Sequence, residues 1–278
     1  MKLENEQLMR LAPSIFATEP WEQVSERYAF IPTIKVVDAL RDEGFVPVVA
    51  RQTRTRVEGK GEFTKHMLRF RREVDMNIPS VVDGNAHHFF KDAPEIPELV
   101  LVNSHDRSSG YQLSAGMWRQ VCSNGLMVQS ASIAGISIRH SGDVVGEVIE
   151  GSYQIINEMP RALDRIERFK HTMLDAQQKE IFATAALELR YPKDESGNQR
   201  SPILAPQLLN ARRRVDEGND LWTVFNCVQE NFMRGGLKGI ATTGRRTRTR
   251  KIGSVNEDVR LNKALWTLTE QMEEYMSK

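Results

Sequence analysis

The sequence predicts an α+β fold in which a basic antiparallel β-hairpin or sheet with flanking helices is followed by a helical C-terminal half. β-Branched and alternating residues concentrate before about residue 150, whereas residues 160 to 189 are mostly strong helix formers. Strands and helices do not alternate regularly, so a doubly wound α/β fold is not expected. At 278 residues the chain can bury one large core or two modest ones. We expect a β-rich domain over residues 1–150 and a helical region with a basic, glycine-rich loop over residues 151–278.

The first predicted elements are a short helix and a long hairpin. Thr33 is a suitable cap for a helix that ends at Gly44, because small polar residues cap helix starts and glycine follows helix ends. The β-branched run that follows predicts a strand reaching Arg56, then a turn over residues 59–61. Residues 63–74 alternate, which predicts a partner strand with one buried and one exposed face.

Shorter elements are predicted up to residue 150. The pattern predicts a loop or insertion over residues 75–97, strands at 98–103 and 111–113, a turn at 104–110, a helix from Ser114 to Cys122, and strands at 133–139 and 144–149.

The C-terminal half carries helical patterns. Apolar residues recur at helical spacing from Pro160 to Leu189, which predicts a long helix. Further helices are predicted over residues 201–214, 220–235 and 256–276, and the basic stretch at 235–254 predicts a mobile loop or an exposed hairpin.

The charge is concentrated in two short segments. The formal net charge is +1, but residues 51–72 carry +6 and residues 245–251 carry +5, so the remainder carries −10. The two segments contain similar Arg/Thr motifs, Arg-Gln-Thr-Arg-Thr-Arg and Arg-Arg-Thr-Arg-Thr-Arg. One such cluster is equally consistent with a solvated strand face paired to acids, but two related clusters favour a surface for polyanions.

Arginines two residues apart on a strand share a face and stand about 6.6 to 6.8 Å apart, so they suit successive phosphates of an extended nucleic acid strand. The predicted nucleic-acid-binding residues are the cations of the two segments except Arg72, namely Arg51, Arg54, Arg56, Lys60, Lys65, Arg69, Arg71, Arg245, Arg246, Arg248, Arg250 and Lys251. Four aromatic residues could supply stacking surfaces, although core packing is the commoner role for each: Tyr28, Phe30, Tyr111 and Trp118. Trp222 and Trp266 lie on predicted helices and are expected to be packing or interface residues.

No catalytic, metal or cofactor motif is recognisable, so no catalytic residue, metal ligand or cofactor is predicted. The chain has no P-loop, no dinucleotide fingerprint and no nucleophile elbow. The neighbours His87 and His88 would point to opposite faces of a strand, and Ser104-His105-Asp106 is better explained as a turn than as a catalytic triad. An enzyme is therefore less expected than a binding protein.

The location is predicted to be cytoplasmic. No apolar run approaches the roughly 20 residues that span a bilayer, and the N-terminus does not resemble a secretory signal. Cys122 and Cys227 are expected to be reduced core thiols.

Several sequence segments resemble those of an uncharacterised family that is carried by plasmids, prophages and phages and catalogued as a domain of unknown function. These segments include Tyr28-Ala29-Phe30-Ile31-Pro32-Thr33, Thr64-Lys65-His66-Met67-Leu68-Arg69-Phe70-Arg71, Glu98-Leu99-Val100-Leu101-Val102-Asn103-Ser104-His105-Asp106 and Trp222-Thr223-Val224-Phe225-Asn226. The resemblance implies a mobile-element context and no known active site. The order of helix, basic hairpin, third strand and helix also resembles the core of the single-strand annealing recombinases, the group that includes RecT and Redβ, which hold single-stranded DNA in rings or filaments.

Two classes of function follow as hypotheses. The first is a non-enzymatic protein that binds single-stranded nucleic acid and anneals strands in phage or plasmid replication or recombination, as a homo-oligomeric ring or filament without a membrane partner. The alternative is an anti-defence factor that binds a host protein or a nucleotide signal.

Overall fold

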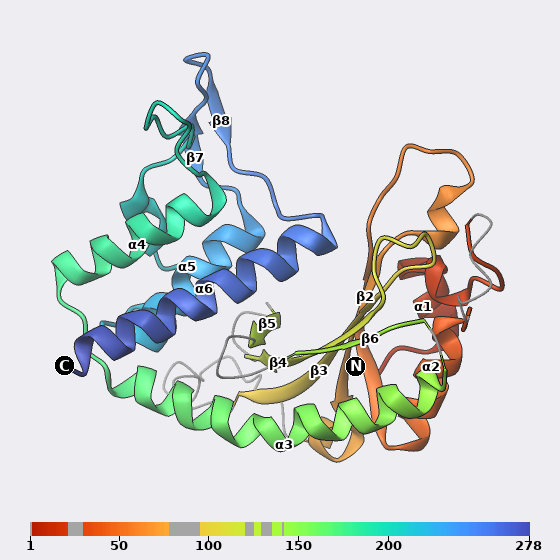
Figure 1. Cartoon of the computed structure of the whole chain (residues 1–278). Coiled ribbons are helices and arrows are strands. Elements are labelled where there is room, and N and C mark those ends of the chain that lie inside the picture. Colours follow the sequence, from red (N-terminus) through yellow and green to blue (C-terminus); the bar gives the residue numbers. More distant parts are fainter. Residues whose placement is uncertain (1, 22–29, 78–94, 120–124, 129–134, 141) are drawn as a thin grey trace. The chain divides into compact units, whose positions relative to one another are not determined.

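The computed structural model describes residues 2–21, 30–77, 95–119, 125–128, 135–140 and 142–278 (Figure 1). These residues form two compact units, one made of residues 2–21, 30–77, 95–118, 125–128, 135–140 and 142–160, and the other of Arg119 and residues 161–278. The long helix α3 contributes to both, and Pro160 lies inside it. The prediction of an α+β fold is confirmed.

An antiparallel sheet forms the centre of the first unit. Its strands are β1 (Phe45–Gln52), β2 (His66–Arg72), β3 (Ile96–Asn103), β4 (Tyr111–Trp118) and β5 (Gly125–Val128), hydrogen-bonded in that order, and β6 (Ile136–Ile138) also pairs with β4. The helices of this unit are α1 (Asn5–Leu11), α2 (Thr33–Asp42) and the first part of α3 (Val144–His171). Gly151 brings α3 against the sheet, because a Cβ at this position would lie 2.8 Å from the side chain of Leu113.

Helices dominate the second unit. They are the end of α3, α4 (Ala176–Arg190), α5 (Leu221–Arg234) and α6 (Val255–Met276), and the short strands β7 (Lys238–Ile240) and β8 (Arg246–Arg248) form a separate hairpin. The predicted packing role of the tryptophans is confirmed, since both are buried. The ring centres of Trp266 and Phe169 are 5.3 Å apart, and the ring of Trp222 stacks on that of Phe225. None of the helices in the described part of the chain combines the length and apolar character that a membrane span requires.

The predicted helix from Ser114 to Cys122 is wrong where the structure can be compared. Residues 111–118 form β4, in which Ser114 pairs with Val100. A small polar residue is compatible with a helix cap in isolation, but hydrogen bonding to β3 decides the conformation here. Cys122 itself, like His87, His88 and Tyr28, lies outside the described residues.

The predicted strand at 144–149 is also wrong, because this segment is the first turn and a half of α3. Asp143 accepts a hydrogen bond from the backbone N–H of Gly146 at 3.0 Å, which is the geometry of a helix cap. The predicted helix from 160 to 189 is in fact two helices, because Asp175 and Gln178 form a capping box that starts α4. The predicted helix at 201–214 is replaced by short 3₁₀ turns at 205–209 and 214–216.

A buried polar network joins α2 to the sheet. The hydroxyl of Thr33 lies 2.9 Å from Nε2 of His66, 3.0 Å from Nε2 of His105 and 3.1 Å from the amide nitrogen of Asn103. All four side chains are fully buried. The turn at Ser104-His105-Asp106 is confirmed, since Ser104 and Asp106 bond to the backbone of Ser109 and Ser108, but His105 points into the core.

The hydrogen-bond partners fix the protons in this network. Nδ1 of His66 lies 2.9 Å from the Ser14 hydroxyl, which gives its own proton to Oε1 of Gln52, and 3.2 Å from the carbonyl of Thr64. Nδ1 therefore carries the proton and Nε2 accepts from the Thr33 hydroxyl. Thr33 has then used its only proton, so Nε2 of His105 must donate to it. Nδ1 of His105 is left without a proton and without a partner among the described residues. Both imidazoles are therefore neutral.

We predict that acid destabilises the fold through these two histidines. Burial lowers the pKa of His66 to about 4 and that of His105 to about 3, and the neighbouring Asp106 only partly opposes this effect. An unfolded histidine has a pKa of about 6.5, so the unfolded chain binds more protons below this pH and stability falls as the pH falls from about 6.5 toward 4. Between pH 7 and pH 5 the free energy of unfolding should drop by something on the order of 4 kcal/mol for the two groups.

Urea denaturation at both pH values measures this loss, with the variant His171→Asn as a control because His171 is exposed. Equal free energies of unfolding at pH 7 and pH 5 would show that the two histidines are not held neutral.

Candidate nucleic-acid interface

Two arginines fix the base of the β7–β8 hairpin. Arg190 donates to the carbonyls of Phe232 and Arg250, each at 2.6 Å, and Arg212 donates to the carbonyl of Gly235 at 2.5 Å. Gly235 ends α5 with a φ of 63°, and a Cβ there would lie 2.6 Å from the carbonyl carbon of Arg250. Only glycine fits this close approach, and it sets the direction in which the hairpin leaves the helices (Figure 1).

One side of the hairpin packs on the segment before α5. A Cβ on Gly239 would overlap the carbonyl oxygen of Pro202, so the strand β7 lies directly on this segment. The backbone N–H of Ile240 donates to the same carbonyl at 2.8 Å, and the amide of Gln207 donates to the carbonyl of Lys238 at 2.8 Å. The outer edge of β7 is therefore occupied by protein.

The other side carries cations. Lys238 pairs with Arg248 and Ile240 pairs with Arg246, so these four side chains share the side opposite to Gly239. They line a shallow hollow of about 610 Å³ together with Gly239 and Thr247. We call the side formed by Lys238, Ile240, Arg246 and Arg248 the cationic hairpin face.

These cations have no acidic partner in the described part of the chain. Lys238, Arg246 and Arg248 form no ion pair there, and neither do the neighbouring Arg245, Arg250 and Lys251; the five arginine and lysine residues of the 245–251 segment are all exposed. Lys238 stands directly opposite Arg248, an arrangement that destabilises a pair of strands unless an anion neutralises it. Of the predicted mobile loop and exposed hairpin, the structure shows the hairpin, and among the described residues no acid pairs with these cations.

The first basic segment is divided by the fold. Arg54 and Arg56 are exposed in the loop after β1 and have no ion pair with a described residue. Lys60 pairs with Asp106 at 3.2 Å. Arg51 and Lys65 are half-buried, and burial lowers the pKa of the Lys65 ammonium.

The expectation that Arg69 and Arg71 line an exposed surface is wrong. Both are buried and bonded to the carboxylate of Glu98, which is itself fully buried; the Arg71 bond is 2.7 Å long. The guanidinium of Arg71 also lies 4.0 Å from the ring centre of Trp118. The strand β2 lies between β1 and β3 and both its faces are covered, so a polar alternation in its sequence does not mark a solvent face.

Sequence reasoning missed Lys238 and Ile240 as members of the cationic hairpin face. Lys238 is separated from the arginine cluster by six residues and joins it only through strand pairing. A hairpin is indicated by the glycines at its two turns, Gly235-Gly236 and Gly244. These glycines do not determine which residues of the two strands pair with each other. Of the predicted stacking residues, the three that the structure describes are engaged elsewhere: Tyr111 is buried, Phe30 packs on His105, and Trp118 contacts Arg71.

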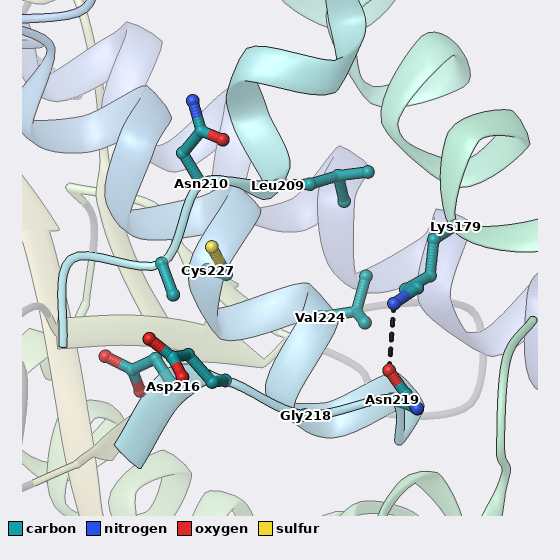
Figure 2. A pocket seen from close by; sticks show the side chains of 10 residues that line it. Lys179, Leu209, Asn210, Asp216, Gly218, Asn219, Val224 and Cys227 are labelled. Atoms are coloured by element: carbon teal, nitrogen blue, oxygen red, sulfur yellow. Dashed lines mark hydrogen bonds between the residues drawn. The ribbon is translucent and has the colours of Figure 1, made fainter. Parts of the chain in front are cut away.

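The pocket in Figure 2 lies in the same unit, and several of the polar side chains that line it are bonded to other residues. It has a volume of about 740 Å³ and is lined by residues that include Asp216, Cys227 and Lys179. The two oxygens of Asp216 accept from Arg119 and Arg213 at 2.5 and 2.6 Å, and Lys179 donates to Asn219 at 2.9 Å. Burial raises the pKa of the free Cys227 thiol to about 12, so it is protonated and not nucleophilic. Cys227 is the buried reduced thiol that was predicted.

No metal centre is apparent in the ranges that the structure describes. No group of three or more histidine, cysteine or carboxylate side chains is arranged there to hold an ion.

We predict that Gly239→Ala detaches the hairpin from the Pro202 segment, because the added Cβ overlaps a carbonyl oxygen that cannot rotate away. Gly253→Ala is the matched control, since nothing lies within 4 Å of the position of its Cβ and its φ is not positive. Hydrogen exchange of the 236–250 amides should become at least tenfold faster in Gly239→Ala and stay unchanged in Gly253→Ala, with global unfolding little affected. Equal protection in both variants would contradict the packing described above.

Comparison with known proteins gives relatives along nearly the whole chain. A family model described as "Domain of unknown function (DUF932)" matches residues 20–266. UPF0380 protein YafZ of Escherichia coli (strain K12) is 39% identical over 270 residues, and UPF0380 protein YfjQ of the same organism is 40% identical over 270 residues. Each alignment covers 97% of this chain and 91% of the relative. No solved structure matches the chain.

Proposed function

We propose that this chain, which belongs to the DUF932 family, binds unpaired nucleic acid strands through the phosphate backbone and promotes their annealing. The observation that carries the proposal is the cationic hairpin face, in which three cations without acidic partners among the described residues lie on one exposed side of a two-stranded sheet.

The geometry of this face suits an extended polyanion. Arg246 and Arg248 are two residues apart on β8 and therefore stand about 6.6 to 6.8 Å apart along the strand. A guanidinium gives forked, charge-assisted hydrogen bonds to phosphate oxygens and carries no base preference. A bound phosphate between Lys238 and Arg248 would also remove the repulsion between them.

The hairpin is anchored within its own unit by hydrogen bonds from Arg190, Arg212 and Gln207. We infer that it offers a preorganised contact to a ligand. Preorganisation favours affinity, because less conformational entropy is lost on binding.

Annealing needs more than one contact on a strand. Arg54 and Arg56 offer a second exposed pair with the same Arg-Thr-Arg spelling, and a ring or filament of several chains would multiply weak sites through effective concentration. Like the single-strand annealing recombinases that the order of its elements resembles, the protein would act in the cytoplasm on strands from phages or plasmids, without a cofactor. This part of the proposal rests on analogy of element order and predicts oligomers in light scattering.

We predict that the double substitution Arg246→Ala and Arg248→Ala weakens binding to unpaired oligonucleotides of every base composition about equally, by about tenfold at 0.1 M salt. Loss of two phosphate contacts should also reduce the slope of log Kd against log salt concentration by about 1.4. The matched control is Arg168→Ala, an exposed arginine on α3 in the same unit. Fluorescence anisotropy over a salt series measures both quantities.

Unchanged affinity and an unchanged salt slope in the double variant would refute the proposal. Circular dichroism should show that both variants fold normally, because the replaced side chains are exposed.

A further inference from the structure

An aliphatic side chain stands among the cations of the hairpin. Ile240 is 62% exposed, lies directly opposite Arg246 and is two residues from Lys238 on the same side of β7. The contacts of this part of the hairpin with Pro202 are made by Gly239 and by the backbone N–H of Ile240, and the Ile240 side chain remains exposed.

A second exposed aliphatic residue lies at the margin of this face. The side-chain amide of Gln207 accepts from the backbone N–H of Leu204 at 2.9 Å and donates to the carbonyl of Lys238 at 2.8 Å, so the backbones of the two residues are close. Leu204 is 74% exposed. Apolar surface is therefore present both within and beside the cationic hairpin face.

The neighbouring charges restrict which partner can use this apolar surface. A single isoleucine beside three cations that have no acidic partner among the described residues does not resemble a protein interface, whose centre is depleted of charge. A plain polyphosphate would neutralise the cations but would leave Ile240 in water. An unpaired nucleic acid strand offers phosphates and, within a few ångströms of them, sugar and base faces that can cover an aliphatic side chain, whereas a duplex hides its base faces in the stack.

We propose that Ile240 contacts the bases or sugars of an unpaired strand and makes the cationic hairpin face selective for single strands over duplex and over simple polyphosphate. This inference rests on the proposed function and deepens it: the cations supply affinity for phosphate, and Ile240 supplies the preference for unpaired nucleotides.

The test compares Ile240→Ser with Ile181→Ser. Ile181 lies on α4 in the same unit and is 56% exposed, so it controls for the removal of an exposed isoleucine. Binding of a fluorescent unpaired oligonucleotide, of its duplex and of inorganic polyphosphate as a competitor is measured at one salt concentration. Ile240→Ser should weaken binding to the unpaired strand by about fivefold and leave the duplex and polyphosphate affinities unchanged. Ile181→Ser should change none of the three.

The inference is overturned if Ile240→Ser leaves the affinity for the unpaired strand unchanged, or weakens all three ligands equally. A loss confined to the duplex would overturn it too, because the isoleucine would then act as a wedge between stacked base pairs.

The double variant Arg246→Ala and Arg248→Ala separates this inference from the proposed function. If that variant retains full affinity for the unpaired strand, the proposed function itself fails. If it loses affinity while Ile240→Ser does not, phosphate binding stands and only the selectivity by Ile240 is wrong.

Discussion

An unpaired charge is costly to bury, and this cost divides the cations of the chain into two groups. Arg69 and Arg71 are buried because Glu98 lies between them, and Arg213 is held by Asp216 and Glu230. The cations of the β7–β8 hairpin have no such partner among the described residues and remain in water. Which group an arginine belongs to depends on which acid the fold brings beside it, not on the arginines that surround it in sequence.

The fold of each unit follows from the same constraint on polar groups. In the first unit, the Thr33 hydroxyl bonds to one nitrogen of His66 and one of His105 inside an otherwise apolar core, and it also accepts from the amide of Asn103. Burial there favours the neutral form of both histidines. In the second, nearly every residue of α5 is buried, including polar ones such as Asn231, whose amide bonds to carbonyls in the segment before the helix. Polar groups therefore hold helix to sheet in one unit and helix to loop in the other.

Local sequence signals predicted α2, α5, α6 and the first three strands, because caps and periodicity act within a few residues. These signals failed where a segment distant in the sequence determines the conformation or the burial of a residue. Ser114 is drawn into β4 by pairing with β3, and Arg69 is buried by an acid 29 residues away. The start of α3 was missed for a different reason: Asp143 is a good cap, but the valines that follow it favour strands in isolation.

Only part of the candidate interface could be predicted from the sequence, because some of its residues are brought together by strand pairing. The charge of Arg245, Arg246 and Arg248 can be read directly from the sequence, but the membership of Lys238 and Ile240 depends on strand register, which a hairpin sequence rich in glycine leaves open. Once the register is known, Gly239 explains which side faces water, since a strand without a Cβ at this position can lie on the Pro202 carbonyl and turn its charged neighbours outward. The contact between Gly239 and the Pro202 segment thus determines which side of the hairpin carries the cations.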